Sequence, residues 1–116
     1  MGFGEAPLPG FEGRRVKADK PHYEQHRSRL RERFDRAGAV ALADYELLEL
    51  VLFRAIPRRG VKPLSKKLLA EFGDFAHVIS APRSRLNAVA GLGEAAIREF
   101  KVVEAAAHRL AQSRVM

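Results

Sequence analysis

Between Arg54 and Lys67, the segment RAIPRRGVKPLSKK carries six cations and no acid. Gly60 precedes a helical pattern, so the backbone amides that follow it have no intrahelical partners. Unpaired amides at a helix N-terminus and basic side chains both attract anions, which predicts a phosphate-binding site. The side chains that we expect to bind there are those of Arg58, Arg59, Lys62 and Lys66. The alternative is that these cations only solubilise a turn beside a very apolar helix.

A second segment, VAGLG, places Gly91 and Gly93 between two helical patterns. Each glycine costs roughly 1 kcal/mol inside a helix, so the pair indicates either a helix break or close approach of the backbone to a ligand. Glu94 follows directly, and the sequence shows no cation beside it. We therefore expect the segment from residue 54 to 67 to dominate binding, and the two glycines mainly to shape the second junction. A tight helix connection packed by Leu92 is the alternative.

No group of residues predicts catalysis or a metal site. His22 and His26 are one helical turn apart, but the sequence offers no third ligand and contains no cysteine. The serines at 65, 80 and 84 have no evident base beside them. We therefore expect this chain to have no cofactor and no enzymatic activity of its own.

Composition favours a polyanionic partner. The 116 residues include 21 Lys and Arg against 14 Asp and Glu, which gives a net charge of +7 and a pI near 10.4. No apolar run approaches the ~20 residues of a membrane span, and residues 1–13 lack the features of a secretory signal. The expectation is a cytoplasmic protein with no membrane partner.

Hydrophobic periodicity predicts an all-α chain. Residues 1–18 read as a flexible arm, and residues 19–116 as one domain, a compact bundle of about five helices. Arg27 lies on the apolar stripe of the first helix, so we expect its aliphatic stem to be buried. The helical segments expected in this domain are 19–37, 44–56, 61–72, the short 74–79, 83–90, and a long helix from the second glycine to about residue 112.

The segment DYELLELVLFRAIPRRGVKPLSKKLLAEFG, followed by LNAVAGLGEAA, resembles the N-terminal region of the bacterial RadC family. The resemblance covers about residues 22–112. It implies a tandem helix-hairpin-helix domain similar to the second domain of the RuvA Holliday-junction protein, with junctions at residues 57–63 and 91–93. It also implies DNA as the partner and DNA repair as the process.

Full RadC-like chains continue into a JAMM-type, metalloprotease-like domain whose zinc-ligand pattern this sequence lacks. We therefore expect a non-catalytic module that binds DNA phosphates with little sequence preference. The alternative is a protein-interaction module that positions a JAMM-type domain or packs on another protein.

Three positions depart from the family pattern. Gly60 replaces a common aspartate, which gives up a side-chain cap but removes a negative charge. Ala43 replaces a common serine, which leaves half of a capping box with Glu46. Ala96 stands where many relatives have lysine, which weakens the case for phosphate binding at the second junction.

Overall fold

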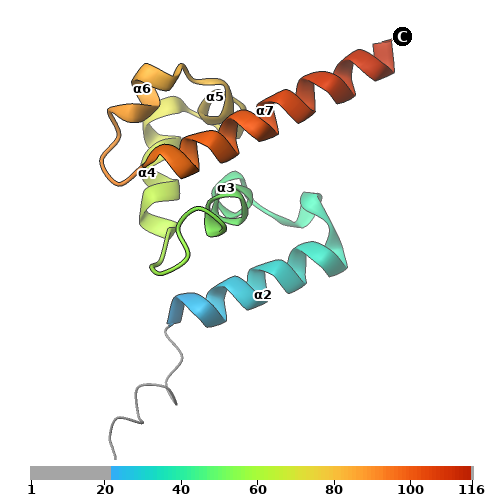
Figure 1. The fold of residues 1–116 in the computed structure, drawn as a ribbon. Helices are drawn as coiled ribbons and strands as arrows, with labels where there is room; N and C mark the ends of the chain where they lie inside the picture. Colours follow the sequence, from blue (N-terminus) through green and yellow to red (C-terminus); the bar gives the residue numbers. More distant parts are fainter. Residues whose placement is uncertain (1–21, 116) are drawn as a thin grey trace, which may run out of the picture.

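The computed structural model describes residues 22–115, and these residues form helices and connecting turns without any strand. The predicted all-α class is confirmed, and the six α-helices in this part of the chain correspond to the six helical segments expected from periodicity, one more than the estimate of about five (Figure 1). The expected arm, residues 1–18, lies outside the described residues. The elements are α2 (His22–Ala37), a 3-10 turn η1 (Ala39–Ala41), α3 (Asp44–Phe53), α4 (Lys62–Phe72), α5 (Phe75–Ser80), α6 (Arg83–Asn87) and α7 (Glu94–Val115).

Two helices end at a glycine, and a third begins after an aspartate, at the positions that the sequence predicts. Helix α2 stops before Gly38 (φ 83°), and α4 stops before Gly73 (φ 109°). Helix α5 begins after Asp74, whose carboxylate accepts a hydrogen bond from the His77 amide at 2.8 Å. That backbone hydrogen bond, together with the His77 side chain, lowers the pKa of Asp74.

Helix α3 ends earlier than expected, at Phe53 rather than at residue 56. A further helical turn would need an amide at position 57 to bond the Phe53 carbonyl, and Pro57 has none. Arg27 supplies the donor instead, with its Nη1 3.1 Å from that carbonyl. Pro57 therefore ends the helix at Phe53, one helical turn before the proline itself.

Helix α6 also ends early, at Asn87 rather than at residue 90. The Val89 amide bonds the carbonyl of Leu86 at 3.1 Å, three residues back, and the Leu92 amide bonds that of Val89 at 3.2 Å. These tight turns reverse the chain before α7 begins.

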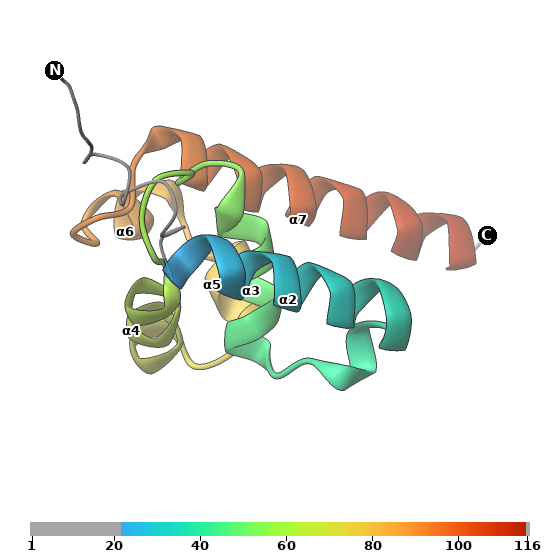
Figure 2. The ribbon, with the colours of Figure 1, turned by 90° about the horizontal axis from the view of Figure 1, so that it is seen from below.

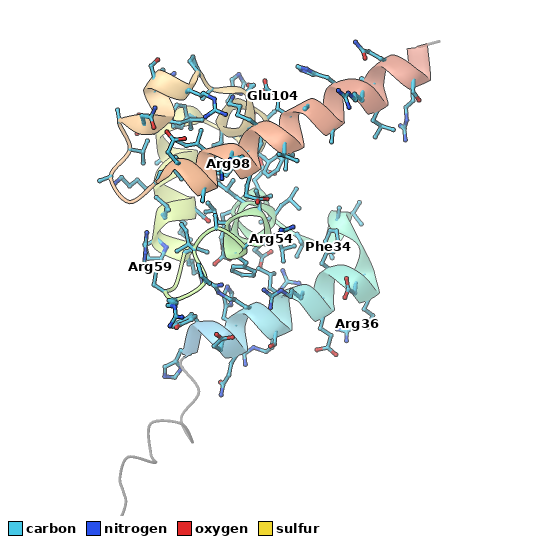
Figure 3. The ribbon with its side chains drawn as sticks, in the orientation of Figure 1. Phe34, Arg36, Arg54, Arg59, Arg98 and Glu104 are labelled. Carbon is cyan, nitrogen blue, oxygen red and sulfur yellow. The ribbon has the colours of Figure 1, made fainter. Side chains whose placement is uncertain are left out.

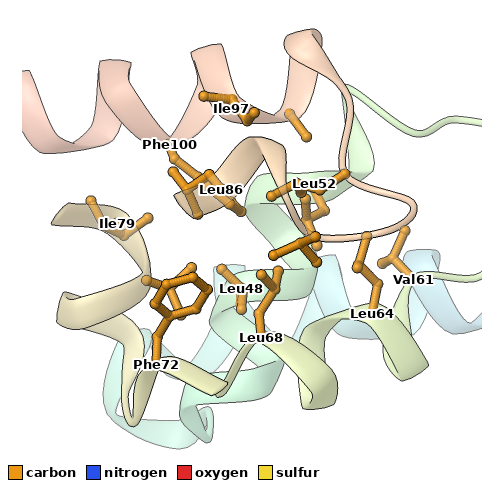
Figure 4. Close-up of a cluster of buried hydrophobic side chains, with 14 of the residues drawn as sticks. Leu48, Leu52, Val61, Leu64, Leu68, Phe72, Ile79, Leu86, Ile97 and Phe100 are labelled. Carbon is orange, nitrogen blue, oxygen red and sulfur yellow. The ribbon is translucent and has the colours of Figure 1, made fainter. Parts of the chain in front are cut away.

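Helix α3 is the centre of the packing and contacts α2, α4, α5 and α7. Its Leu48 and Leu52 are fully buried against leucines of α4 and the apolar stripe of α7 (Figure 4). The other labelled core residues in Figure 4 are Val61, Leu64, Leu68, Phe72, Ile79, Leu86, Ile97 and Phe100.

Helix α7 extends past this core. Its N-terminal half packs on α3, α5 and α6, whereas the C-terminal half projects away from these helices (Figure 1). Seen from below, only the end of α7 reaches past α2 (Figure 2). Within residues 22–115, no helix has both the length and the apolar character needed to cross a lipid bilayer.

Lys101 of α7 closes the carbonyl end of α5. Its Nζ donates to the carbonyls of Ile79 (3.1 Å) and Ala81 (2.7 Å) and lies 3.0 Å from the Glu104 carboxylate. A cation at the C-terminal end of a helix interacts favourably with the helix dipole. This contact therefore fixes the end of α5 against α7.

Half of a capping box opens α3, as predicted. The Glu46 carboxylate accepts from the Ala43 amide at 3.0 Å, but alanine has no side-chain oxygen to return the bond. Glu46 also pairs with Arg33, and this hydrogen bond is the main cause that lowers the pKa of Glu46.

Ala43→Ser completes this box and is expected to raise the free energy of unfolding by about 1 kcal/mol, measured by urea denaturation. Val40→Ser is the matched control, because Val40 is 96% exposed in the neighbouring 3-10 turn. An equal effect of the two substitutions would contradict the capping explanation.

Candidate functional site

Two turns and the start of α4 carry the residues that the sequence predicts for the site. The first turn, residues 54–61, joins α3 to α4, and the second turn, residues 88–93, joins α6 to α7. Arg59 of the first turn donates from Nη2 to the Gly91 carbonyl of the second at 3.0 Å (Figure 3 labels Arg59). Lys67 of α4 donates to the neighbouring Ala90 carbonyl at 3.3 Å. The two turns therefore lie side by side.

Arg58 and Gly60 are both exposed in the first turn. Within residues 22–115, Arg58 has no hydrogen-bond or ion-pair partner. Gly60 does not have a positive φ, and a Cβ there would meet only the Tyr23 Cβ at 3.9 Å. The backbone therefore does not require glycine at position 60.

Helix α4 begins beside these residues with no side-chain cap. Its N-cap is Val61, one residue after Gly60, and a proline stands in its first turn. Uncapped amides leave the positive end of the helix dipole without a protein acceptor. The exposed side chains of Arg58 and Lys62 add charge of the same sign nearby.

Lys62 and Lys66 stand over one aromatic ring. Their Nζ atoms lie 5.7 Å and 4.9 Å from the ring centroid of Tyr45, which belongs to the first turn of α3. Such exposed cation–π contacts contribute roughly 0.5–1 kcal/mol each. They hold both lysines on one side of α4, a role of Tyr45 that the sequence did not predict.

In the second turn, the two glycines differ. Gly91 has a φ of 88°, whereas Gly93 has no positive φ, and a Cβ added at Gly93 would meet nothing within 4 Å. Leu92 between them is buried at 6% exposure, as expected. The sequence predicted no cation near Glu94, and this was wrong: folding brings Arg83 Nη1 of α6 to 3.8 Å from its carboxylate.

Arg27 departs most from expectation. Its whole side chain is buried, at 3% exposure, and not the stem alone. The guanidinium donates to the carbonyls of Phe53 (3.1 Å), Ile56 and Arg59 (2.7 Å). It also lies 4.6 Å from the Phe53 ring centroid and 5.3 Å from that of Tyr23. Burial is the main cause that lowers the pKa of Arg27, and arginine remains charged throughout the physiological range.

The side chains of His26 in α2 and Glu49 in α3 are within hydrogen-bond distance of each other. His26 Nε2 lies 3.0 Å and 3.2 Å from the carboxylate oxygens of Glu49, which is fully buried in α3. Among the described residues, no three His, Cys, Asp or Glu side chains gather as metal ligands would. His26 therefore has a structural partner.

Comparison with known proteins gives one family match. Residues 23–98 match the family model described as UPF0758 N-terminal. A UPF0758 protein of Ruegeria pomeroyi is 63% identical over 91 residues, which cover 78% of this chain and 41% of that protein. A UPF0758 protein of Rhodobacter capsulatus is 62% identical over 87 residues, which cover 75% of this chain and 41% of that protein. The chain thus spans about two fifths of the length of these relatives, and no solved structure matches it.

The two glycines of the second turn provide a matched pair of substitutions. Gly91→Ser is expected to lower the free energy of unfolding by about 1–2 kcal/mol, because an L side chain must enter the left-handed region. Gly93→Ser is expected to change it by less than about 0.5 kcal/mol, since the position is open and precedes a helix. Urea denaturation of both variants checks this, and equal losses would refute it.

Proposed function

This chain belongs to the UPF0758 family, which is the RadC-like family, and on this premise we propose that it is a non-catalytic DNA-binding module. It would bind the phosphate backbone with little sequence preference, in the DNA repair that the family resemblance implies. The single observation that carries the proposal is the acid-free run of cations in and after the first turn. Six cations lie between residues 54 and 67, and all six are exposed, three in the first turn and three on α4.

The arrangement of the turns supports a tandem helix-hairpin-helix interpretation. Each turn joins two helices and precedes a helix N-terminus, at α4 and at α7. In such a motif, backbone amides hold a phosphate without reading a base. The contacts from Arg59 and Lys67 to the second turn would let one DNA backbone run along both.

The first turn and α4 would provide most of the binding. The side chains assigned to DNA phosphates are those of Arg58, Arg59, Lys62 and Lys66. Gly60 would contribute its amide, and Gly91 and Gly93 would shape the second turn. At that turn, Arg83 partly offsets the charge of Glu94, which makes a passing phosphate less unfavourable there than the sequence suggests.

Salt dependence tests this proposal. Because each neutralised phosphate contributes about 0.9 to the slope of log affinity against log salt, four contacts predict a slope of about 3 to 4 for duplex DNA. Arg58→Ala is expected to weaken binding and to lower the slope by about 0.9. Fluorescence anisotropy titrations at several salt concentrations measure both quantities.

Arg36→Ala is the matched control, because it removes the same charge from an exposed site on α2 (Figure 3 shows Arg36 and Arg59 well apart). It should leave the slope unchanged. The DNA hypothesis is wrong if the two variants behave alike, or if the native chain binds no better than an unrelated protein of equal net charge.

A second candidate is the interaction module that positions a JAMM-type domain. One observation favours it: an apolar groove of about 350 Å³ between α5 and α7, lined in part by Phe75, Ile79, Val103 and Ala107. Farther along α7, Leu110 is 54% exposed. The partner proposed for this surface is the remainder of the longer UPF0758 relatives.

Leu110→Glu separates the two candidates. If the chain is an interaction module, this substitution should weaken its binding to the separately expressed C-terminal part of the Ruegeria pomeroyi relative by at least about tenfold. DNA affinity should not change, since Leu110 lies far along α7 from both turns. Isothermal titration calorimetry measures the first quantity, and absence of any binding by the native chain removes this candidate.

A further inference from the structure

The buried guanidinium of Arg27 sets the direction of a peptide in the first turn. Its Nη2 binds the Arg59 carbonyl at 2.7 Å, and no peptide bond in the described chain is cis. In a trans peptide, the carbonyl and the following N–H point in opposite directions. The Gly60 amide, which shares this peptide, therefore points away from Arg27.

The Gly60 amide is also without a backbone partner. None of the backbone hydrogen bonds outside helices, within residues 22–115, uses it as a donor. Gly60 is exposed, and the exposed Arg58 stands two residues before it. An outward amide beside an exposed cation is suited to an anionic oxygen.

We propose that Arg27 is the positioning residue of the phosphate site: it holds the carbonyls of the first turn inward so that the Gly60 amide faces the DNA backbone. This inference rests on the proposed function. Arg27 itself cannot touch DNA, because it is 3% exposed beneath the turn. It acts through the peptide between Arg59 and Gly60.

Only arginine has the geometry for this role. Three carbonyls, from Phe53, Ile56 and Arg59, accept hydrogen bonds from its two terminal nitrogens. The planar guanidinium offers several donors in a fixed fork and stacks on aromatic rings, whereas lysine has a single nitrogen. Lysine at position 27 would keep the charge and lose part of this network.

The Arg27 hydrogen bonds in the first turn also connect to the second turn, through Arg59. The Arg59 carbonyl is bound by Arg27, while the Arg59 side chain is bound to the Gly91 carbonyl at 3.0 Å. Arg59 is therefore fixed at both its backbone and its side chain. Loss of the Arg27 network should loosen the contact between the turns as well.

Arg27→Lys tests the proposal, with duplex DNA as the probe in anisotropy titrations across salt concentrations. Affinity is expected to fall about tenfold, the equivalent of one lost hydrogen bond to a charged group. The salt slope should stay unchanged, because no phosphate-contacting charge is removed. This combination separates Arg27 from Arg58, whose loss lowers the slope.

Lys101→Met is the control for a purely structural effect. It removes another cation that binds two backbone carbonyls, at the end of α5 rather than in the first turn. Thermal unfolding should show that both variants are destabilised, while DNA affinity at a temperature where both are folded changes only in Arg27→Lys. If affinity is equal in Arg27→Lys and the native chain, or falls equally in the two variants, the proposal is overturned.

Amide NMR gives a second test, and its DNA titration uses only the native chain. The Gly60 amide resonance should shift when duplex DNA is added, and it should also move in DNA-free Arg27→Lys. A native chain that binds DNA with an unmoved Gly60 amide overturns the positioning role. A native chain that binds no DNA overturns the proposed function instead, and the DNA-free comparison then decides whether Arg27 orients the turn.

Discussion

The contact between Arg27 and three backbone carbonyls joins helix α2 to the end of α3 and to the first turn. Removing a charged group from water costs several kcal/mol, so a buried arginine persists only where hydrogen bonds and packing offset that cost. Here, the carbonyls at the C-terminal end of α3 and in the first turn supply the acceptors, and the rings of Phe53 and Tyr23 supply the packing. Pro57 makes the arrangement necessary, because it leaves the Phe53 carbonyl without a helical donor. Helix α2, the end of α3 and the first turn therefore form one unit.

The basic side chains of the first turn and of α4 lie next to this unit. Arg59 and Lys67 bind carbonyls of the second turn, so two segments about thirty residues apart in the sequence present one face. Side chains already held in place lose less conformational freedom on binding, which favours affinity. The lysines over Tyr45 are restrained in the same way. Contacts within the protein thus hold four of these basic side chains in place: those of Arg59, Lys62, Lys66 and Lys67.

The helix ends and caps that the sequence predicted correctly depend on local chemistry. Helix ends at Gly38 and Gly73, the cap at Asp74 and the half box at Ala43 each involve residues within a few positions of one another. Contacts between distant segments were not predictable from periodicity: Arg83 beside Glu94, Glu49 beneath His26, and Arg27 under the first turn. The position of Arg27 on the apolar stripe predicted that its aliphatic stem is buried. It did not identify the backbone carbonyls that the guanidinium binds. The family resemblance is confirmed at the level of the UPF0758 family, while the phosphate contacts stay a prediction.

The C-terminal part of helix α7 projects from the core in a fixed direction. Beyond Val103 its side chains leave the core, yet the helix continues to residue 115 (Figure 1). At 1.5 Å per residue, this projecting part is a rod of about 18 Å whose direction is fixed by the buried half. Because each residue turns the helix by about 100°, inserting or deleting one residue there would leave the core intact and rotate anything attached by more than a quarter turn. The length and the rotational phase of this rod can therefore change without any change in the core.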